Sequence, residues 1–335
     1  MKGRDLLILT AVLLLGGFAV ADALRETATS EPREARPTTT TTEPATTSTE
    51  DDEGPQQLPA VPGAGGDLVF TEVGACAVRE VDLPTGLEHL QTVQASSCEL
   101  WGAPVTAKVA VGIGDPRGDA VPFRFLDLSR PHRELGGGEA LFGALVWSED
   151  GQRAAWCNSQ RIGFDLELGA RRRTLPDCPS AYSPDGDVVY ARGDRLFVED
   201  RPGLQASGTI MKVHYGNDGS VAVLVEGRRI ERYVDGRLTD ALDLQARYHG
   251  RLPTLSPDNC SVAFRAGDRI RILDVGCSRL APTGTIFPGH VAAWSPNGDW
   301  IAIGGAADLT FYDLTGDTDP VVWPVGALQI SWRRG

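Results

Sequence analysis

From residue 67 onward, apolar residues occur in short runs that are separated by polar turn sequences. Residues 221–225 (Val-Ala-Val-Leu-Val) and 300–303 (Trp-Ile-Ala-Ile) are two of these runs. Runs of this length, rich in β-branched and aromatic residues and bounded by Gly, Pro, Asn and Asp, are typical of β-strands. The pattern therefore predicts an all-β fold built from many short strands.

One turn sequence, seen as Trp-Ser-Pro-Asn-Gly at residues 294–298, recurs along this region. Successive copies are 33 to 40 residues apart, an interval that indicates a repeat architecture. In Ser-Pro-Asp-Gly, Pro presets φ, Asp hydrogen-bonds its own backbone and Gly accepts a positive φ, so a tight turn between two strands is predicted. The copies are residues 147–151, 182–186, 215–219, 255–259 and 294–298.

A second marker, an apolar stretch that ends in an acidic residue, recurs at the same spacing. Its seven acidic residues are Asp82, Asp127, Asp165, Glu199, Asp235, Asp274 and Asp313. The two markers keep a fixed phase, which indicates a unit of roughly 38 residues with four strands, a to d. The turn joins strands a and b, and the acidic residue ends strand c. Four-stranded sheets repeated around an axis are the blades of a β-propeller.

The two ends of this region complete one repeat. Residues 327–332 (Ala-Leu-Gln-Ile-Ser-Trp) have the pattern of a strand a with no further strands behind it. The first unit, beginning at Leu68, has a strand c marker at Asp82 but no strand a. Pairing the two fragments closes the ring and leaves no long sheet edge exposed. We therefore predict seven four-stranded blades over residues 67–335, with six as the alternative if residues 94–135 are misread.

The Trp-Ser-Pro-Asn-Gly turn followed by an apolar strand resembles the TolB-type propeller repeat and, more distantly, the WD-repeat propellers. The resemblance covers residues 67–335 and implies the propeller fold. The TolB family also carries an α/β domain ahead of its propeller, and nothing in this sequence matches that domain. Propellers of this type bind proteins or other ligands through one face, which is what the resemblance implies for function.

The N-terminal part of the chain carries an export signal. Residues 6–21 form an uncharged apolar run after Lys2 and Arg4. Its length fits a cleaved signal peptide, and an extension to Leu24 fits a signal-anchor transmembrane helix, so both stay open for residues 1–24. Residues 25–66 are rich in Thr, Pro and Glu and nearly free of large apolar side chains, which predicts a disordered linker. We expect an extracytoplasmic protein that is membrane-anchored or secreted.

Six cysteines in an exported chain predict disulfides. In the blade scheme, pairing the cysteines in sequence order joins residues on the same face of the propeller and keeps every closed loop short. A metal site would need Cys and His clustered at ligand spacing, which these positions lack. The predicted pairs are Cys76–Cys98, Cys157–Cys178 and Cys260–Cys277.

The remaining chemistry of the sequence points to binding. A net charge of −13 argues against nucleic acid as a partner. None of the common catalytic or phosphate-binding motifs is present, and His290 is expected to make a structural hydrogen bond. We therefore name no catalytic, cofactor-binding or metal residues and no cofactor. Residues 259–261 (Asn-Cys-Ser) form a glycosylation sequon, and Trp101, Trp147, Trp294 and Trp332 are expected to pack between blades.

We expect a non-catalytic propeller that binds a protein or small ligand at the cell envelope, with the membrane as a second partner if the N-terminal helix is retained. The expected binding face carries the d–a and b–c loops, including residues 206–212 and 245–251. One alternative is a lactonase- or lyase-like enzyme with a site assembled in the central channel. Another alternative is a sugar- or peptide-binding sensor.

Overall fold

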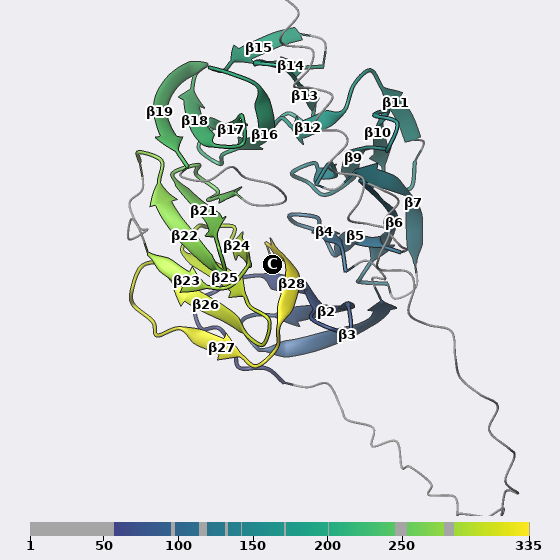
Figure 1. Ribbon diagram of the computed structural model, residues 1–335. Coiled ribbons are helices and arrows are strands. Elements are labelled where there is room, and N and C mark those ends of the chain that lie inside the picture. Colours follow the sequence, from purple (N-terminus) through teal and green to yellow (C-terminus); the bar gives the residue numbers. More distant parts are fainter. Residues whose placement is uncertain are drawn as a thin grey trace, which may run out of the picture. The chain divides into compact units, whose positions relative to one another are not determined.

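The computed structural model describes residues 57–94, 98–113, 119–130, 133–141, 143–170, 172–199, 201–244, 253–277 and 285–334. These residues form seven antiparallel sheets of four strands each, and Figure 1 shows the sheets arranged in a ring. The predicted seven-bladed β-propeller is therefore confirmed. The predicted export segment, residues 1–24, and linker residues 25–56 lie outside the described residues.

We number the blades 1 to 7 in chain order, with strand a innermost and strand d outermost. Blade 1 consists of β28 (Ala327–Arg333), β1 (Asp67–Glu72), β2 (Ala77–Asp82) and β3 (Leu87–Gln94). Blade 2 consists of β4 (Leu100–Gly102), β5 (Lys108–Gly112), β6 (Ala120–Asp127) and β7 (Glu134–Leu141). Blade 3 consists of β8 (Val146–Trp147), β9 (Arg153–Cys157), β10 (Gly163–Glu167) and β11 (Arg172–Leu175).

Blades 4 to 7, like blades 2 and 3, each consist of four consecutive strands. Blade 4 consists of β12 (Pro179–Tyr182), β13 (Val188–Arg192), β14 (Arg195–Val198) and β15 (Arg201–Gln205). Blade 5 consists of β16 (Ile210–Tyr215), β17 (Val221–Val225), β18 (Arg229–Val234) and β19 (Arg237–Asp243). Blade 6 consists of β20 (Thr254–Leu255), β21 (Ser261–Ala266), β22 (Arg269–Asp274) and β23 (Ile286–Pro288). Blade 7 consists of β24 (Val291–Trp294), β25 (Trp300–Gly304), β26 (Leu309–Asp313) and β27 (Val321–Trp323).

The ring closes in blade 1, where the last strand pairs with the first. In the antiparallel ladder between β28 and β1, Trp332 lies opposite Leu68 and Arg333 lies opposite Asp67. β28 is therefore the innermost strand of a blade whose other three strands come from the beginning of the described chain. This arrangement confirms the closure predicted from the incomplete repeats at the two ends.

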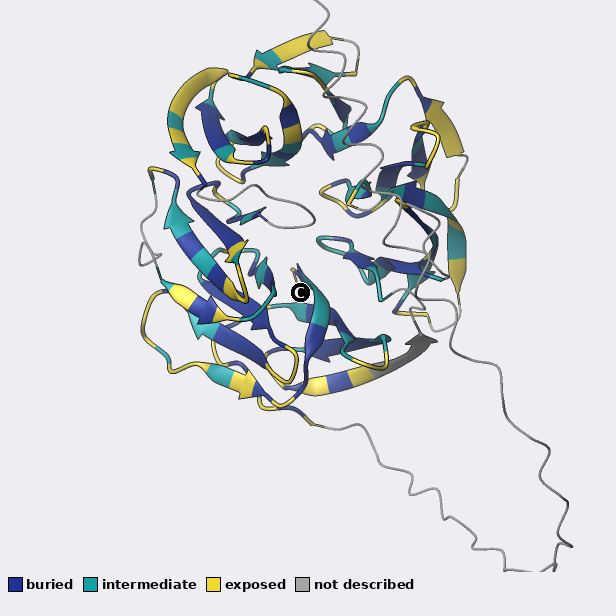
Figure 2. Cartoon of the chain, viewed as in Figure 1, coloured by how far each residue is buried: buried dark blue, intermediate teal, exposed yellow. Residues whose placement is uncertain are grey.

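The core consists of seven clusters of buried apolar side chains, one at each contact between neighbouring blades. Successive side chains of a β-strand point to opposite faces of the sheet, so an apolar second strand contributes to the clusters on both sides of its blade. In β17, Val223 and Val225 pack towards blade 4, whereas Ala222 and Leu224 pack towards blade 6. Figure 2 shows that the inner strands are largely buried and the outermost strands are the most exposed.

The recurring a–b turns have the geometry that their sequence predicts. In blade 7, the Ser295 hydroxyl donates to Asn297 Oδ1 at 2.7 Å and accepts from the Trp300 amide at 2.9 Å. Gly298 adopts a φ of 82°, which is left-handed backbone that favours glycine. The local hydrogen bonds satisfy backbone groups that the tight reversal leaves outside the ladder.

Residues 57–66, which the sequence assigns to the linker, pack against blades 1 and 7. We call this segment the strap. Val61 is fully buried, and its amide donates to the Leu83 carbonyl at 2.9 Å. The Trp323 indole N–H donates to the Pro59 carbonyl at 2.8 Å. The folded unit therefore begins before Asp67, because a few apolar residues within a polar segment are enough to cover the joint between two blades.

Candidate functional site

The innermost strands and the a–b turns surround a central channel. A cavity of about 790 Å³ is lined by strands and turns of blades 2 to 5 and by the residue after β28, Arg334. A second hollow of about 310 Å³ is lined by blades 5, 6, 7 and 1. The two hollows share Pro104, His214, Tyr215, Asn217 and Arg334, so they are parts of one channel. All seven blades contribute to its lining.

Tryptophan side chains link the innermost strands around this channel. Trp147 Nε1 donates to the Trp101 carbonyl at 3.2 Å between blades 3 and 2. Trp294 Nε1 donates to the Thr254 carbonyl at 3.2 Å between blades 7 and 6. Trp332 bonds in the same way to the strap. These tryptophans therefore pack between blades, as the sequence predicts, although Trp147 also lines the cavity.

His214 is the one imidazole in the described lining of both hollows. Its Nδ1 lies 2.6 Å from Asn259 Oδ1, across the boundary between blades 5 and 6. Burial lowers the pKa of His214, the hydrogen bond that the ring donates to Asn259 Oδ1 opposes this effect, and the charge of Lys212 lowers the pKa further. Because an amide oxygen can only accept, the Nδ1 atom of His214 is the donor in this contact.

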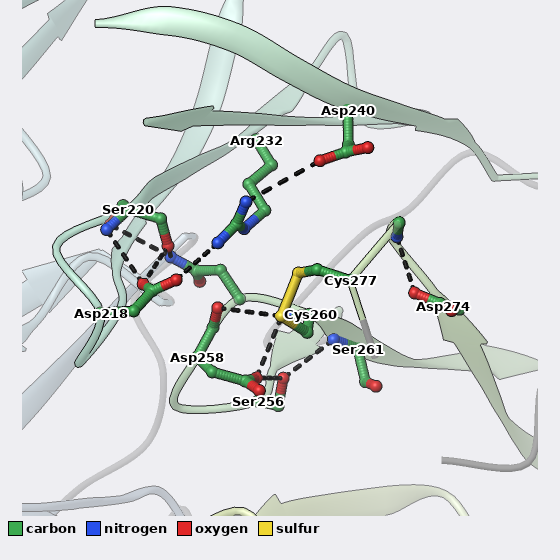
Figure 3. The surroundings of a disulfide bond; sticks show 12 residues. Asp218, Ser220, Arg232, Asp240, Ser256, Asp258, Cys260, Ser261, Asp274 and Cys277 are labelled. Carbon is green, nitrogen blue, oxygen red and sulfur yellow. Dashed lines mark hydrogen bonds and ion pairs between the residues drawn. A yellow bond between two sulfur atoms is a disulfide. The ribbon is translucent and has the colours of Figure 1, made fainter. Parts of the chain in front are cut away.

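Asn259 occupies the last position of an a–b turn, where other copies have Gly. Its φ is 57°, and its side chain is fully buried. Nδ2 donates to the Ser220 hydroxyl at 2.9 Å and to the Ser220 carbonyl at 3.2 Å. The amide nitrogen that a glycan would modify is thus buried and occupied, so the sequon at residues 259–261 has a structural role between blades 5 and 6. Figure 3 shows the surroundings of the Cys260–Cys277 disulfide, including Ser220.

Three polar residues meet at the mouth of the channel. Arg334 Nη1 lies 3.5 Å from Glu149 Oε1 in the blade 3 turn. Arg334 Nη2 donates to Asn217 Oδ1 in the blade 5 turn at 3.3 Å. The Arg334 amide donates to the Pro104 carbonyl in blade 2 at 2.9 Å. A single arginine therefore joins three blades across the channel.

The sequence contains a signal for this mouth that our motif analysis missed. Proline occupies the third position of the a–b turn in blades 4, 6 and 7, at residues 184, 257 and 296. Glu149 and Asn217 replace this proline in blades 3 and 5, and Arg334 has the equivalent position after Trp332. Proteins often break a local sequence rule at a functional site. Residues that depart from the consensus of a repeat are therefore candidates for function. The three departures come together in space.

Most of the acidic markers cap local backbone. The carboxylates of Asp82, Asp127, Asp274 and Asp313 accept from amides two or three residues ahead. Asp165 differs: it is buried and accepts from Arg153, Arg173 and Tyr182, which joins blades 3 and 4. Although burial raises the pKa of Asp165, these hydrogen bonds and the Arg153 charge hold it below its usual value.

The cysteines form the three disulfides predicted from the blade scheme, and none is free. Two of them join neighbouring blades, with Cα–Cα distances of 4.6 Å for Cys76–Cys98 and 5.1 Å for Cys157–Cys178. The third, Cys260–Cys277, lies within blade 6 with a Cα–Cα distance of 5.0 Å. These cross-links support an extracytoplasmic protein, because disulfides persist in oxidising compartments.

The face expected to bind carries a smaller hollow. A space of about 720 Å³ is lined by residues of blade 5 and by Ser207 from the expected binding segment, residues 206–212. The other expected segment, residues 245–251, lies outside the described residues. Below this hollow, buried Glu231 accepts from Ser207, Tyr233 and Arg229. The channel on the opposite, a–b side is thus the larger described cavity.

The ionisable groups elsewhere are spread over the blades. In the described part of the chain, no three His, Cys, Asp or Glu side chains are grouped so that they could hold a metal ion. His290 donates its backbone amide to the Gly304 carbonyl at 2.9 Å. Burial lowers the pKa of the His290 ring, and Arg265 adds to this effect. The ring also makes a hydrogen bond to the Ala327 backbone, which raises its pKa, and this side-chain contact fits the structural hydrogen bond expected from the sequence.

The chain has a similar protein among the solved structures. No protein-family model and no curated protein matches the chain. The solved structure of TolB from Acinetobacter baumannii is similar, with 15% sequence identity, 80% of this chain and 67% of that chain covered, and a TM-score of 0.46. Among residues 57–334, as far as they are described, no helix is long and apolar enough to cross a membrane. The described part of the chain is a seven-bladed β-propeller, as its seven four-stranded sheets show.

Proposed function

We propose that this chain is an extracytoplasmic, membrane-tethered and non-catalytic propeller that binds an extended peptide segment of a partner protein in its central channel. The observation that carries the proposal is the cavity of about 790 Å³ bounded by innermost strands and a–b turns. Ligand sites in proteins have volumes of roughly 300–1,000 Å³, so the cavity has the size of a binding site.

The lining suits a peptide. Each innermost strand is the edge of its sheet, and edge strands present backbone N–H and C=O groups that an extended chain can pair with. Between these edges lie the aromatic rings of Trp147 and Tyr215 and the amide of Asn217. This lining favours an extended peptide, because its backbone can pair with the strand edges while its side chains contact the rings and the polar groups.

The polar groups of the channel favour binding over catalysis. Glu149 is the one carboxylate among the described residues that line the cavity, and its partner is Arg334. His214 is held by Asn259 instead. General acid–base catalysis requires groups that are positioned within hydrogen-bond reach of the substrate protons that they transfer. Because the two groups have separate partners, we base the function on recognition.

The sequence supports the tether, and the disulfides support the compartment. Three disulfides fit an oxidising compartment outside the cytoplasm. The apolar run at residues 6–21 then serves as a signal-anchor, and the polar segment that follows serves as a spacer. Intact-mass measurement of the chain from the membrane fraction tests this part, because a mature chain that lacks residues 1–21 would contradict the anchor.

A peptide library tests the binding site. Random dodecapeptides displayed on phage are selected on the full-length chain, and enriched peptides are synthesised. Pro184 is replaced by the photo-cross-linker p-benzoylphenylalanine, because Pro184 lines the cavity and the equivalent turn position holds Glu or Asn in other blades. Leu238, exposed on the outer strand β19, carries the same cross-linker as the control.

Enriched peptides are expected to cross-link to position 184 and not to position 238. Failure of every peptide to enrich, or equal cross-linking at both positions, would contradict channel binding. A parallel panel of oligosaccharides distinguishes the sensor alternative, since saturable sugar binding without peptide binding would replace the proposal.

A further inference from the structure

The channel mouth already contains a cation from the chain itself. The Arg334 guanidinium lies between Glu149 Oε1 and Asn217 Oδ1, which belong to different blades. Both acceptors occupy the third turn position, where other copies have proline. The turn can form with proline, so these two side chains are not needed for its geometry. Their common property is that they accept hydrogen bonds from one guanidinium.

Arg334 is held loosely. The side chains of Arg334 and Glu149 are 45% and 59% exposed, and their closest N–O distance is 3.5 Å. The preceding residue, Arg333, is the opposite case, because its side chain is 2% exposed and pairs with Glu80 and Asp67. Exposed ion pairs contribute little stability. Arg333 therefore anchors the strand, and the Arg334 side chain is free to leave its acceptors.

The surroundings of this position attract cations. A hollow of about 530 Å³ adjoins the mouth, and its charged lining residues are Glu149, Asp150, Asp185, Arg334 and Arg153, of which Arg153 is paired with Asp165. The chain carries a net charge of −13. A recess lined by carboxylates concentrates positive groups near its walls. A guanidinium from outside would find the same acceptors that Arg334 uses.

We propose that the bound peptide carries an arginine whose guanidinium replaces that of Arg334 between Glu149 and Asn217. Arg334 is then an internal latch that competes with the ligand and swings out when the ligand enters. This inference rests on the proposed channel function and deepens it by naming the side chain recognised at the mouth. An arginine fits this position because its planar fork reaches two acceptors at once.

Two matched peptide pools test the latch on the full-length chain. Both pools contain fluorescent acetylated octapeptides with random residues around a fixed central position, which is arginine in one pool and citrulline in the other. Citrulline has nearly the same shape as arginine but no charge. The variants are Arg334→Ala, which removes the latch, and Glu149→Gln, which removes the acceptor charge. Arg228→Ala is the control, because Arg228 is an exposed arginine at the opposite face with an ion pair to Glu226.

We expect the arginine pool to bind more tightly than the citrulline pool. Arg334→Ala should tighten binding of the arginine pool about three- to five-fold, because an exposed ion pair no longer competes. Glu149→Gln should abolish the preference for arginine over citrulline. Arg228→Ala should leave both affinities unchanged.

The outcomes separate this inference from the proposed function. If both pools bind equally well to the wild-type chain and to every variant, the channel binds peptides but the latch proposal is overturned. If Arg334→Ala weakens or does not change binding of the arginine pool, the latch is overturned as well. If neither pool binds to any form of the chain, both proposals fail. Equal melting temperatures of the variants exclude misfolding as the cause.

Discussion

Arg333 and Glu80 form a buried ion pair that fastens the last strand of the chain to the first blade. Arg333 lies at the end of β28, and Glu80 lies in β2, two strands away within blade 1. The same guanidinium reaches Asp67 Oδ2 at 3.2 Å and the Thr106 carbonyl at 3.1 Å. One side chain thus contacts blades 1 and 2 at the place where the ring closes.

Replacing Arg333 by Met is expected to lower the free energy of unfolding by about 3–5 kcal/mol, because the buried Glu80 carboxylate would lose the positive charge that faces it. Urea unfolding followed by tryptophan fluorescence measures the loss. The matched control is Arg124→Met, since Arg124 and Glu134 form an exposed pair whose removal should cost less than about 1 kcal/mol. Similar costs for the two variants would contradict a special role for the buried pair.

A double variant separates the charge from the packing. When Glu80→Leu is added to Arg333→Met, the more buried of the two carboxylates that pair with Arg333 is removed as well, and only the partly exposed Asp67 remains. Most of the lost stability should then return, since apolar residues of similar volume often replace a buried ion pair without cost. A double variant as unstable as Arg333→Met would show that packing, and not charge, determines the effect.

Asp165 should make part of the stability depend on acid pH. The pKa of Asp165 in the folded chain lies below the reference value of 3.8, because hydrogen bonds from Arg153, Tyr182 and Arg173 outweigh the effect of burial. A depressed pKa contributes stability that is fully present above pH about 4 and is lost as the pH falls through the folded-state pKa. The difference in unfolding free energy between wild type and Asp165→Asn should therefore shrink as the pH is lowered from 6 to below 4. A difference that stays constant over this range would contradict the assignment.

The strap makes a prediction about where the folded unit begins. A chain that starts at residue 57 should unfold at the same urea concentration as the full-length chain, because the strap is kept. A chain that starts at residue 67 should be less stable by several kcal/mol, since it exposes the surfaces that Leu58, Val61 and Ala64 cover. Val61→Asp in the full-length chain disrupts the strap by a single substitution and should also lower the free energy of unfolding. Equal stability of the two shortened chains would place the boundary at Asp67.

The disulfides between blades should stabilise the ring. Cys157 and Cys178 are 21 positions apart, and Cys76 and Cys98 are 22 apart. Closing loops of this length contributes about 3 kcal/mol each in the chain-entropy model. Replacing both cysteines of either pair by Ala should lower the unfolding free energy by about this amount, measured under non-reducing conditions. The wild-type chain in dithiothreitol should be less stable than either double variant.

The sequence predicts the fold well because the signals that define it are local. Each Ser-Pro-Asp-Gly turn and the strand behind it can be recognised within about ten residues, and Trp332 can be seen to lack the strands that should follow it. The channel mouth is different. Glu149, Asn217 and Arg334 are far apart in sequence, and only the closed ring brings their turns together. The strap was missed for a similar reason, because Val61 lies in a polar stretch and is buried only by blades at both ends of the chain.

Asn259 gives the last test, because its backbone and its side chain can be examined separately. Asn259→Gly keeps the positive φ of 57° accessible but removes the hydrogen bonds to Ser220 and His214, so a loss of about 1–3 kcal/mol is expected. Asn259→Ala removes the same bonds and adds a left-handed backbone cost of roughly 1–2 kcal/mol. Urea unfolding of the two variants should therefore rank wild type, Gly and Ala in order of decreasing stability. Expression in a host that glycosylates secreted proteins should leave Asn259 unmodified by intact mass, and a glycan on this residue would show that the amide is accessible while the chain folds.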